Sequence, residues 1–449
     1  MMLTIVNNDF ICSVAHRWQS VLSDSNFSID NVKREVVMKE NKSGLSRRTF
    51  IRNSALGLGA LVGGYPLLQG CSSGDKGSSG ADVAGSGKAV KSCYLPITDA
   101  TPIILAHELG FYKEMGIASE RPVLIRGWAP MAEAFMAGRF NLTHLLAPIP
   151  VYMKYSKGFP VKVVAWDHIN GSAITVGKNS GITSYKDLGG KQIAIPYWYS
   201  MHNVIIQMIA REYGIETVIQ DKNASLSDRQ MNLFVMAPPD MPTAMASGAI
   251  DGYIVAEPFN AAGEILAEGR IVRFTGDVWK NHPCCVAVMN EKDLEDQVWS
   301  HSVIKALVKA ELWALNNAEE AAHILSKDGA QYLPLPEKVV KRAMMKYDTE
   351  TYGANGGTGA IQHPDWQAQR LSYNPYQFES ATRHMVEMMK QTKMEGDTAF
   401  LQSLDPGTVQ RELMYTAGVE AAAAELGGLA QFAGVDPANP FTREEVIAI

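Results

Sequence analysis

Short apolar runs alternate with amphipathic segments along the chain between residues 90 and 290. Runs of strand length predict buried strands, and segments with helical periodicity predict helices. The expected strands are 91–95, 122–125, 142–146, 161–165, 173–176, 192–195, 232–236, 250–254, 271–274 and 285–289. The expected helices in this region are 101–112, 130–137, 148–157, 201–212, 239–245 and 258–267. Such an alternation is typical of an α/β fold.

The order of these elements predicts two lobes. A break in the pattern at 177–181 ends the first α/β unit, and a second complete unit follows it. The chain then returns to the first unit through two further strands. This arrangement leaves two connecting segments and a cleft that can close over a ligand. We therefore expect lobe 1 at 90–178 plus 271–449, and lobe 2 at 179–270.

Beyond residue 290 the pattern becomes helical, which predicts a helical C-terminal extension. The expected helices are 303–317, 319–325, 336–345 and 376–389. A glycine-rich loop at 353–359 lies among them. It does not fit a phosphate-binding loop, because no Lys-Ser or Lys-Thr pair follows it and no clear strand-to-helix frame holds it.

The segment before the α/β region has the pattern of an export signal. Arg47 and Arg48 precede an apolar run that ends at Leu-Gln-Gly-Cys71. The run is too short to span a bilayer, which takes about 20 apolar residues. The arginine pair resembles a Tat signal, and the end of the run resembles a lipobox, whose cysteine is lipidated. A weak core helix over 55–64 is the alternative interpretation.

Residues 1–70 are therefore interpreted as a leader, with Met38 as an alternative translation start. The following segment, 71–89, is expected to be a flexible tether, because its Gly/Ser-rich sequence cannot bury apolar surface. These features predict a periplasmic or extracytoplasmic lipoprotein, anchored to the membrane through its N-terminal lipid.

The composition is that of an ordinary globular protein. Apolar residues make up 46% of the 449 residues and charged residues 20%, with a net charge of −6 at pH 7. The negative charge and the lack of a polybasic patch argue against nucleic acid as a partner. Without the leader the chain is still too long for one hydrophobic core, in agreement with two lobes. We expect a monomer.

The chain has five cysteines, of which Cys12 and Cys71 belong to the leader and the lipid site. No Cys-x-x-Cys pair or histidine spacing typical of zinc accompanies the other three. Buried thiols are expected at Cys93, Cys284 and Cys285. A disulfide between Cys93 and one member of the adjacent pair remains open.

Several phrases between residues 91 and 290 resemble one protein family. They are LPITDATP at 95–102, AHELGFY at 106–112, LLAPIP at 145–150, PPDMP at 238–242, AEPFNA at 256–261 and WKNHP at 279–283. Their order and spacing resemble the extracytoplasmic solute-binding proteins of ABC importers, in the nitrate/sulfonate/bicarbonate (NMT1/THI5-like) family. The resemblance implies a two-lobed type II periplasmic-binding-protein fold with two hinge strands. It also implies capture of a small solute and its delivery to an ABC permease and its ATPase.

Catalysis is not expected, because the chain has no nucleophile elbow, no His-Glu-x-x-His motif and no cofactor fingerprint. A ligand sensor that docks to a receptor is an alternative to transport, since both use the same closure of two lobes.

Four candidate ligand-binding residues occur at the ends of expected elements. Thr98 and Asp99 follow the first strand, where open α/β sheets bind ligands. Thr98 could donate to an anion, whereas Asp99 could instead cap the next helix. Trp128 could form an apolar wall of the site or close the core. His202 begins a lobe 2 helix, where free N–H groups favour an anion, and the resemblance implies a ligand contact there; a surface or capping role is the alternative.

Glu257 lies in the Glu-Pro phrase of the family. A carboxylate would repel an anion unless it met a cation or accepted from a protonated ligand. The resemblance to bicarbonate-like members implies that a metal ion can accompany the solute, with Glu257 as its candidate ligand. The alternative is that it sets the entry to the next helix, with Pro258 in the first turn. No other cofactor is expected. The remaining candidates for the site are Pro148, Ser172 and Tyr199.

The nature of the solute stays open. The helix after Phe259 lacks the basic residue expected for nitrate. A larger or flatter organic ligand, such as a pyrimidine precursor of thiamine, could stack on the aromatic residues Tyr197, Trp198, Tyr199, Tyr253 and Phe259.

Overall fold

The computed structural model describes residues 87–222, 224–345 and 348–449. The chain divides into two units, 1–80 and 81–449, and the following account concerns the second. The predicted leader, with Arg47, Arg48, Met38 and the lipidation residue Cys71, lies outside the described residues, as does most of the predicted tether. In the part that the structure describes, no helix is both long and apolar enough to cross a bilayer.

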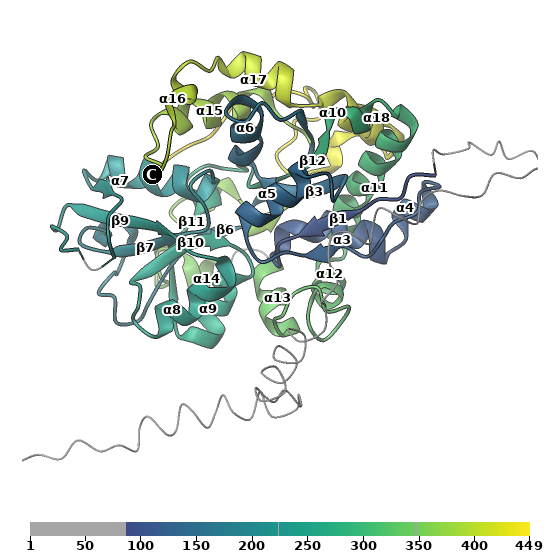
Figure 1. The fold of residues 1–449 in the computed structure, drawn as a ribbon. Helices are drawn as coiled ribbons and strands as arrows, with labels where there is room; N and C mark the ends of the chain where they lie inside the picture. Colours follow the sequence, from purple (N-terminus) through teal and green to yellow (C-terminus); the bar gives the residue numbers. More distant parts are fainter. Residues whose placement is uncertain (1–86, 223, 346–347) are drawn as a thin grey trace, which may run out of the picture. The chain divides into compact units, whose positions relative to one another are not determined.

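The first of two large sheets has five strands in the order β2-β1-β3-β12-β4. Its strands β1, β3 and β12 are labelled in Figure 1. The five strands are β1 (Ser92–Tyr94), β2 (Val123–Leu124), β3 (Leu142–Leu146), β4 (Val161–Trp166) and β12 (Cys285–Asn290). β1 runs parallel to β2 and β3. β12 arrives only after the whole second sheet and inserts antiparallel between β3 and β4. The first sheet is thus completed by a strand from much later in the sequence.

The second sheet has six strands in the order β11-β6-β10-β7-β9-β8. They are β6 (Ser172–Val176), β7 (Gln192–Ile195), β8 (Glu216–Val218), β9 (Gln230–Val235), β10 (Gly252–Ala256) and β11 (Arg270–Phe274). β7 to β10 run parallel, and β6 runs antiparallel to both β10 and β11. Two segments therefore connect the sheets, one from β4 to β6 and one from β11 to β12. The first contains β5 (Ile169–Asn170), which pairs with β13 (Leu371–Ser372).

Helices fill the connections between strands. They are α3 (Thr101–Glu108), α4 (Phe111–Glu114), α5 (Trp128–Met136), α6 (Pro148–Tyr155), α7 (Met201–Glu212), α8 (Met241–Ala246) and α9 (Phe259–Ala267). One helix was predicted over 101–112, and this prediction is wrong. Gly110 has φ 74° and lies between α3 and α4. A left-handed residue cannot continue a right-handed helix, and glycine adopts this conformation at little cost.

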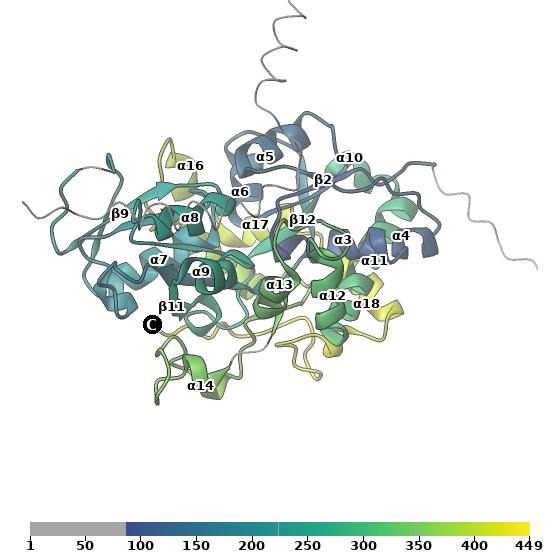
Figure 2. The ribbon, with the colours of Figure 1, turned by 90° about the horizontal axis from the view of Figure 1, so that it is seen from below.

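The C-terminal part is helical, as predicted. Its helices are α10 (Glu291–Leu294), α11 (Gln297–Asn316), α12 (Ala318–Leu325), α13 (Glu337–Met344), α14 (Thr349–Tyr352), α15 (Glu379–Lys390), α16 (Ala399–Gln402), α17 (Pro406–Leu413) and α18 (Thr416–Glu425). Figures 1 and 2 both show α11 alongside α3 and α18, against the first sheet. α15, however, packs on both α6 and α7. The C-terminal extension therefore contacts α6, which follows a strand of the first sheet, and α7, which follows a strand of the second sheet.

Each sheet has an apolar core. Strand residues such as Leu142, Val163 and Val286 pack with α3 and α11 beside the first sheet. In the second sheet, Ile193 and Leu233 pack with Ile205 of α7. Burial of these side chains contributes on the order of 2 kcal/mol each. The polar residues between the two cores are consequently removed from water.

Candidate functional site

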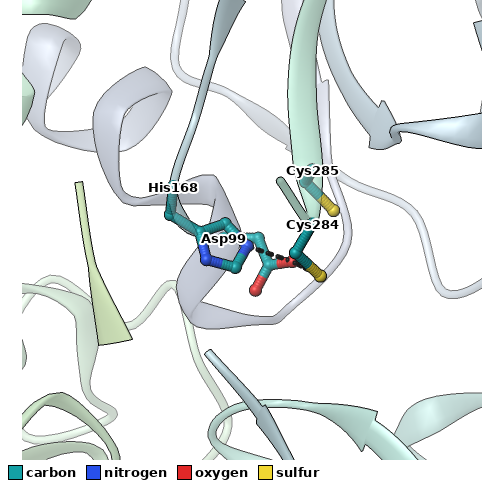
Figure 3. A group of neighbouring side chains, drawn as sticks. All are labelled: Asp99, His168, Cys284 and Cys285. Carbon is teal, nitrogen blue, oxygen red and sulfur yellow. Dashed lines mark hydrogen bonds and ion pairs between the residues drawn. The ribbon is translucent and has the colours of Figure 1, made fainter. Parts of the chain in front are cut away.

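The candidate site lies where the segments connecting the two sheets meet the loop after β1 (Figure 3). Asp99 lies in the short helix η1 (Thr98–Ala100), His168 follows β4, Cys284 directly precedes β12, and Cys285 is the first residue of β12. All four side chains are fully buried. Asp99 Oδ2 lies 2.7 Å from His168 Nε2 and 3.5 Å from Cys284 Sγ. One potential ligand atom from each of the four lies within 4.8 Å of the others, so the group could hold a metal ion.

The second sheet contributes Ser172 and His202 to the same place. Ser172 is the first residue of β6, and its Oγ lies 2.9 Å from His202 Nε2 and 3.6 Å from Cys284 Sγ. His202 Nε2 lies 4.0 Å from Cys284 Sγ. The sequence places His202 there because Ser200 Oγ accepts the Asn203 N–H at 3.0 Å and caps α7. Side chains from both sheets thus converge on Cys284.

Burial and neighbouring charges set the protonation of this cluster. Burial opposes charging of His168, but Asp99 and Cys284 raise its pKa well above the ordinary value. Burial also opposes ionisation of Cys284, but Cys285, His202 and His168 together lower its thiol pKa well below the ordinary value. The pKa of Cys285 is raised by burial and by its contact with Cys284. The directions of these two shifts favour the charged forms of His168 and Cys284.

The two predicted residues after β1 have different roles. Thr98 Oγ1 donates to the main-chain oxygen of Glu257 at 2.9 Å and so links the two sheets. The alternative of Asp99 as a helix cap is wrong, because α3 has no side-chain cap and Asp99 faces His168 instead. Burial is the main reason why the pKa of Asp99 is raised.

Trp128 is the first residue of α5 and is only 3% exposed. Its ring lies edge-on to His144, with ring centroids 5.6 Å apart. Its Nε1 has no hydrogen-bond partner among the described residues. The indole N–H of Trp128 is therefore a buried hydrogen-bond donor beside β3. A role for Trp128 in the ligand site stays a prediction.

Glu257 is occupied by two structural contacts. Its Oε1 lies 2.6 Å from Arg370 Nη2, and its Oε2 accepts the Ala261 N–H at 3.1 Å. The carboxylate thus holds the first turn of α9 and is neutralised by an arginine from the C-terminal extension. The group of possible metal ligands found in the described part of the chain does not include Glu257.

Tyr199 forms an aromatic contact with α6, the helix that begins at Pro148. Pro148 begins α6, and Tyr152 of the same helix stacks on Tyr199 with ring centroids 4.5 Å apart. Phe400 lies 6.3 Å from both rings. This cluster is located just before α7, the helix that carries His202.

The expectation of buried free thiols at Cys93, Cys284 and Cys285 is confirmed. Cys93 donates to Thr143 Oγ1 at 3.2 Å, which excludes a disulfide from Cys93 in this structure. Sequence reasoning did not assign Cys284, Cys285 or His168 to the site. His168 follows a strand of the first sheet, so the strand-end argument that selected Asp99 also applies to it.

Known proteins share this architecture. The sequence profile of the NMT1-like family matches residues 84–326, more than half of the chain. The nitrate/nitrite binding protein NrtA of Nostoc is 24% identical over 343 residues, which are 68% of this chain and 74% of NrtA. The nitrate import ATP-binding protein NrtC of Synechocystis is 27% identical over 257 residues, 55% of this chain. The match spans only 37% of the length of NrtC.

Solved structures are similar in fold. The periplasmic nitrate-binding protein NrtA from Synechocystis has a TM-score of 0.63 and 19% identity, covering 79% of this chain and 92% of its own. The alkanesulfonate-binding protein SsuA from Xanthomonas axonopodis, bound to MOPS, has a TM-score of 0.54 and 15% identity, covering 74% and 99%. A zinc-bound ligand-binding component of an ABC-type import system from Staphylococcus aureus has a TM-score of 0.54 and 19% identity, covering 71% and 99%. These similarities confirm the expected two-lobed periplasmic-binding-protein fold.

Proposed function

The chain belongs to the NMT1-like family, and on this premise we propose that it is the solute-binding component of an ABC importer. It captures a small solute between its two lobes and delivers it to a permease and its ATPase. The observation that carries this proposal is the convergence of Asp99 from one sheet with Ser172 and His202 from the other, all of them buried. A ligand held from both sides favours the closed arrangement of the lobes.

A nitrate-, sulfonate- or bicarbonate-type anion is the proposed solute class. His202 lies in the first turn of α7, a helix of 12 residues, where free N–H groups and the helix dipole attract negative charge. The names of NrtA and SsuA agree with this class. The aromatic cluster around Tyr199 supports the alternative, a flat organic ligand such as a pyrimidine precursor of thiamine.

Binding is the whole of the proposed chemistry. Ser172 and His202 form a hydroxyl–imidazole pair, which in a hydrolase would need a third group to orient the imidazole. His202 Nδ1 has no hydrogen-bond partner among the described residues. The pair therefore lacks the orienting contact of a catalytic triad.

The proposed location is the extracytoplasmic side of the membrane. Arg47 and Arg48 would direct export, and a lipid on Cys71 would hold the monomeric body near its permease, raising its local concentration there. A sensor that docks to a receptor would use the same closure. A gene for a permease next to this one would favour transport, and a gene for a sensor kinase would favour signalling.

A screen of thermal stability tests the proposal. The full chain is heated with nitrate, nitrite, bicarbonate, alkanesulfonates or the pyrimidine precursor, and its tryptophan fluorescence is followed. The true solute raises the melting temperature in proportion to the logarithm of its concentration above its Kd. Failure of all these compounds to change the melting temperature would contradict the proposed solute classes.

A further inference from the structure

We propose that Asp99, His168, Cys284 and Cys285 bind a soft divalent transition-metal ion, for which Zn²⁺ is the natural probe. This inference goes beyond the proposed function, because binding of the metal requires no solute. It also moves the expected metal position from Glu257, whose carboxylate is engaged by Arg370, to the segments that connect the two sheets.

The donor atoms are spaced for a small coordination sphere. Zinc binds thiolates at about 2.3 Å and imidazole at about 2.0 Å, so two donors of a tetrahedral site are about 3.3 to 3.8 Å apart. Asp99 Oδ2 and Cys284 Sγ are 3.5 Å apart, and all four donors lie within 4.8 Å. His168 Nε2 and Asp99 Oδ2 are closer, at 2.7 Å. They would have to separate by less than about 1 Å to share a metal ion.

Several polar atoms of the cluster are buried without hydrogen bonds. Asp99 Oδ1 and both ring nitrogens of His168 have no partner that meets hydrogen-bond geometry among the described residues. His168 Nε2 is thus close to Asp99 Oδ2 but is not directed at it as a hydrogen-bond donor. Unpaired buried groups of this kind destabilise the folded chain. A shared cation would satisfy the carboxylate and, by displacing the proton from one ring nitrogen of His168 to solvent, would bind that nitrogen as well.

Charge also favours a cation. The carboxyl groups of Asp167 and Glu311 are fully buried near His168, and their four oxygens have no hydrogen-bond partner among the described residues. A divalent ion would balance the thiolate of Cys284 and the Asp99 carboxylate.

The chemistry of the donors indicates which ion. Two sulfurs and an imidazole favour zinc and similar soft ions, whereas Ca²⁺ takes six to eight oxygen ligands. The donors come from the loop after β1, the segment leaving β4 and the segment entering β12. A metal ion bound here would therefore link the two segments that connect the sheets to each other and to the loop after β1.

Zinc titration of the full chain tests the site. A control variant, C12S/C71S/C93S, leaves Cys284 and Cys285 as the remaining cysteines. It is reduced, freed of metal with a chelator and titrated with Zn²⁺ alone. We expect one ion per chain, and at least tenfold weaker binding when Cys284→Ser or Cys285→Ser is added. Binding of no stoichiometric zinc by the control, or equal affinity in all variants, would overturn the proposal.

A second measurement remains decisive if the serine variants do not fold. Co²⁺ added to the control variant should give thiolate-to-metal charge-transfer absorption with the intensity of a tetrahedral site. An excess of Mg²⁺ should leave this absorption unchanged. Absence of the absorption, or its loss on addition of Mg²⁺, would show that Cys284 and Cys285 do not coordinate the ion.

Discussion

Ser172 Oγ lies 2.9 Å from His202 Nε2, and both side chains are buried. The contact joins the first residue of β6 to the first turn of α7, so it fixes the imidazole relative to the second sheet. Cys284, which precedes β12 of the first sheet, lies 4.0 Å from the same ring nitrogen. The imidazole therefore lies at the junction of the two sheets.

Replacement of Ser172 by Ala should weaken solute binding without abolishing it. The variant loses a hydrogen bond to His202, and such a bond contributes about 1 kcal/mol, or about fivefold in Kd. Isothermal titration with the solute selected by the stability screen measures the change. Ser300→Ala is the matched control, since Ser300 is equally buried but lies in α11. Equal affinity in the Ser172 and Ser300 variants would argue against the positioning role of Ser172.

Replacement of Arg370 by Met should strongly destabilise the protein. Glu257 would be left as a buried carboxylate without its cation, at a cost of about 3–5 kcal/mol. Urea denaturation measures the free energy of unfolding. Lys178→Met removes an exposed pair with Glu268 and should leave the free energy of unfolding nearly unchanged. Adding Glu257→Gln to Arg370→Met should restore part of the loss; no restoration would mean that the buried charge is not its cause.

The free energy of unfolding should decrease in mild acid because of His144. Its Nε2 accepts the Leu95 N–H at 2.9 Å, and burial lowers its pKa to about 3. The unfolded chain binds this proton near pH 6.5. Between these values the unfolded state holds more protons, so stability is lost as the pH falls from about 6.5 toward 3, by at most about 1.4 kcal/mol per pH unit.

The His144→Gln variant tests this assignment, because an amide oxygen can still accept from Leu95. Urea denaturation from pH 7.5 to pH 5, in the presence of a chelator, should show a shallower pH dependence than in the parent. A parental slope in the His144 variant would assign the acid sensitivity to other groups.

Export depends on the arginine pair if the leader is a Tat signal. Replacement of both Arg47 and Arg48 by Lys should retain the protein in the cytoplasm, because the signal is read by its two arginines. Cell fractionation followed by immunoblotting measures this, with Arg52→Lys as the control. Cys71→Ala should leave export intact but release the protein from the membrane fraction. Normal export of the double lysine variant would exclude the Tat route.

Much of the α/β region could be predicted from hydrophobic periodicity. The strands expected at 142–146 and 192–195 occur with the same bounds, since both are short apolar runs between polar turns. β8 was not predicted, because its sequence Glu-Thr-Val at an edge is only partly buried and has little apolar signal. α18 was also missed; its alanine-rich sequence has a weak apolar stripe.

The site was predicted only in part. Asp99, Ser172 and His202 were selected from strand ends, a helix start and family phrases, and the structure brings these three together around Cys284. The cysteine could not be placed, because periodicity does not reveal that β12 inserts between β3 and β4 next to the loop after β1. The Arg370 contact to Glu257 spans 113 positions in the sequence. A contact between two residues so far apart in the sequence leaves no local sequence pattern from which it could be predicted.

The most direct test of the central claim is isothermal titration of the full chain and its His202→Ala variant with the solute that the stability screen identifies. The account predicts one binding site per chain in the parent and at least tenfold weaker binding in the variant. His301→Ala serves as the control, and circular dichroism verifies that each variant is folded. A folded His202→Ala protein that bound the solute as tightly as the parent would contradict the account.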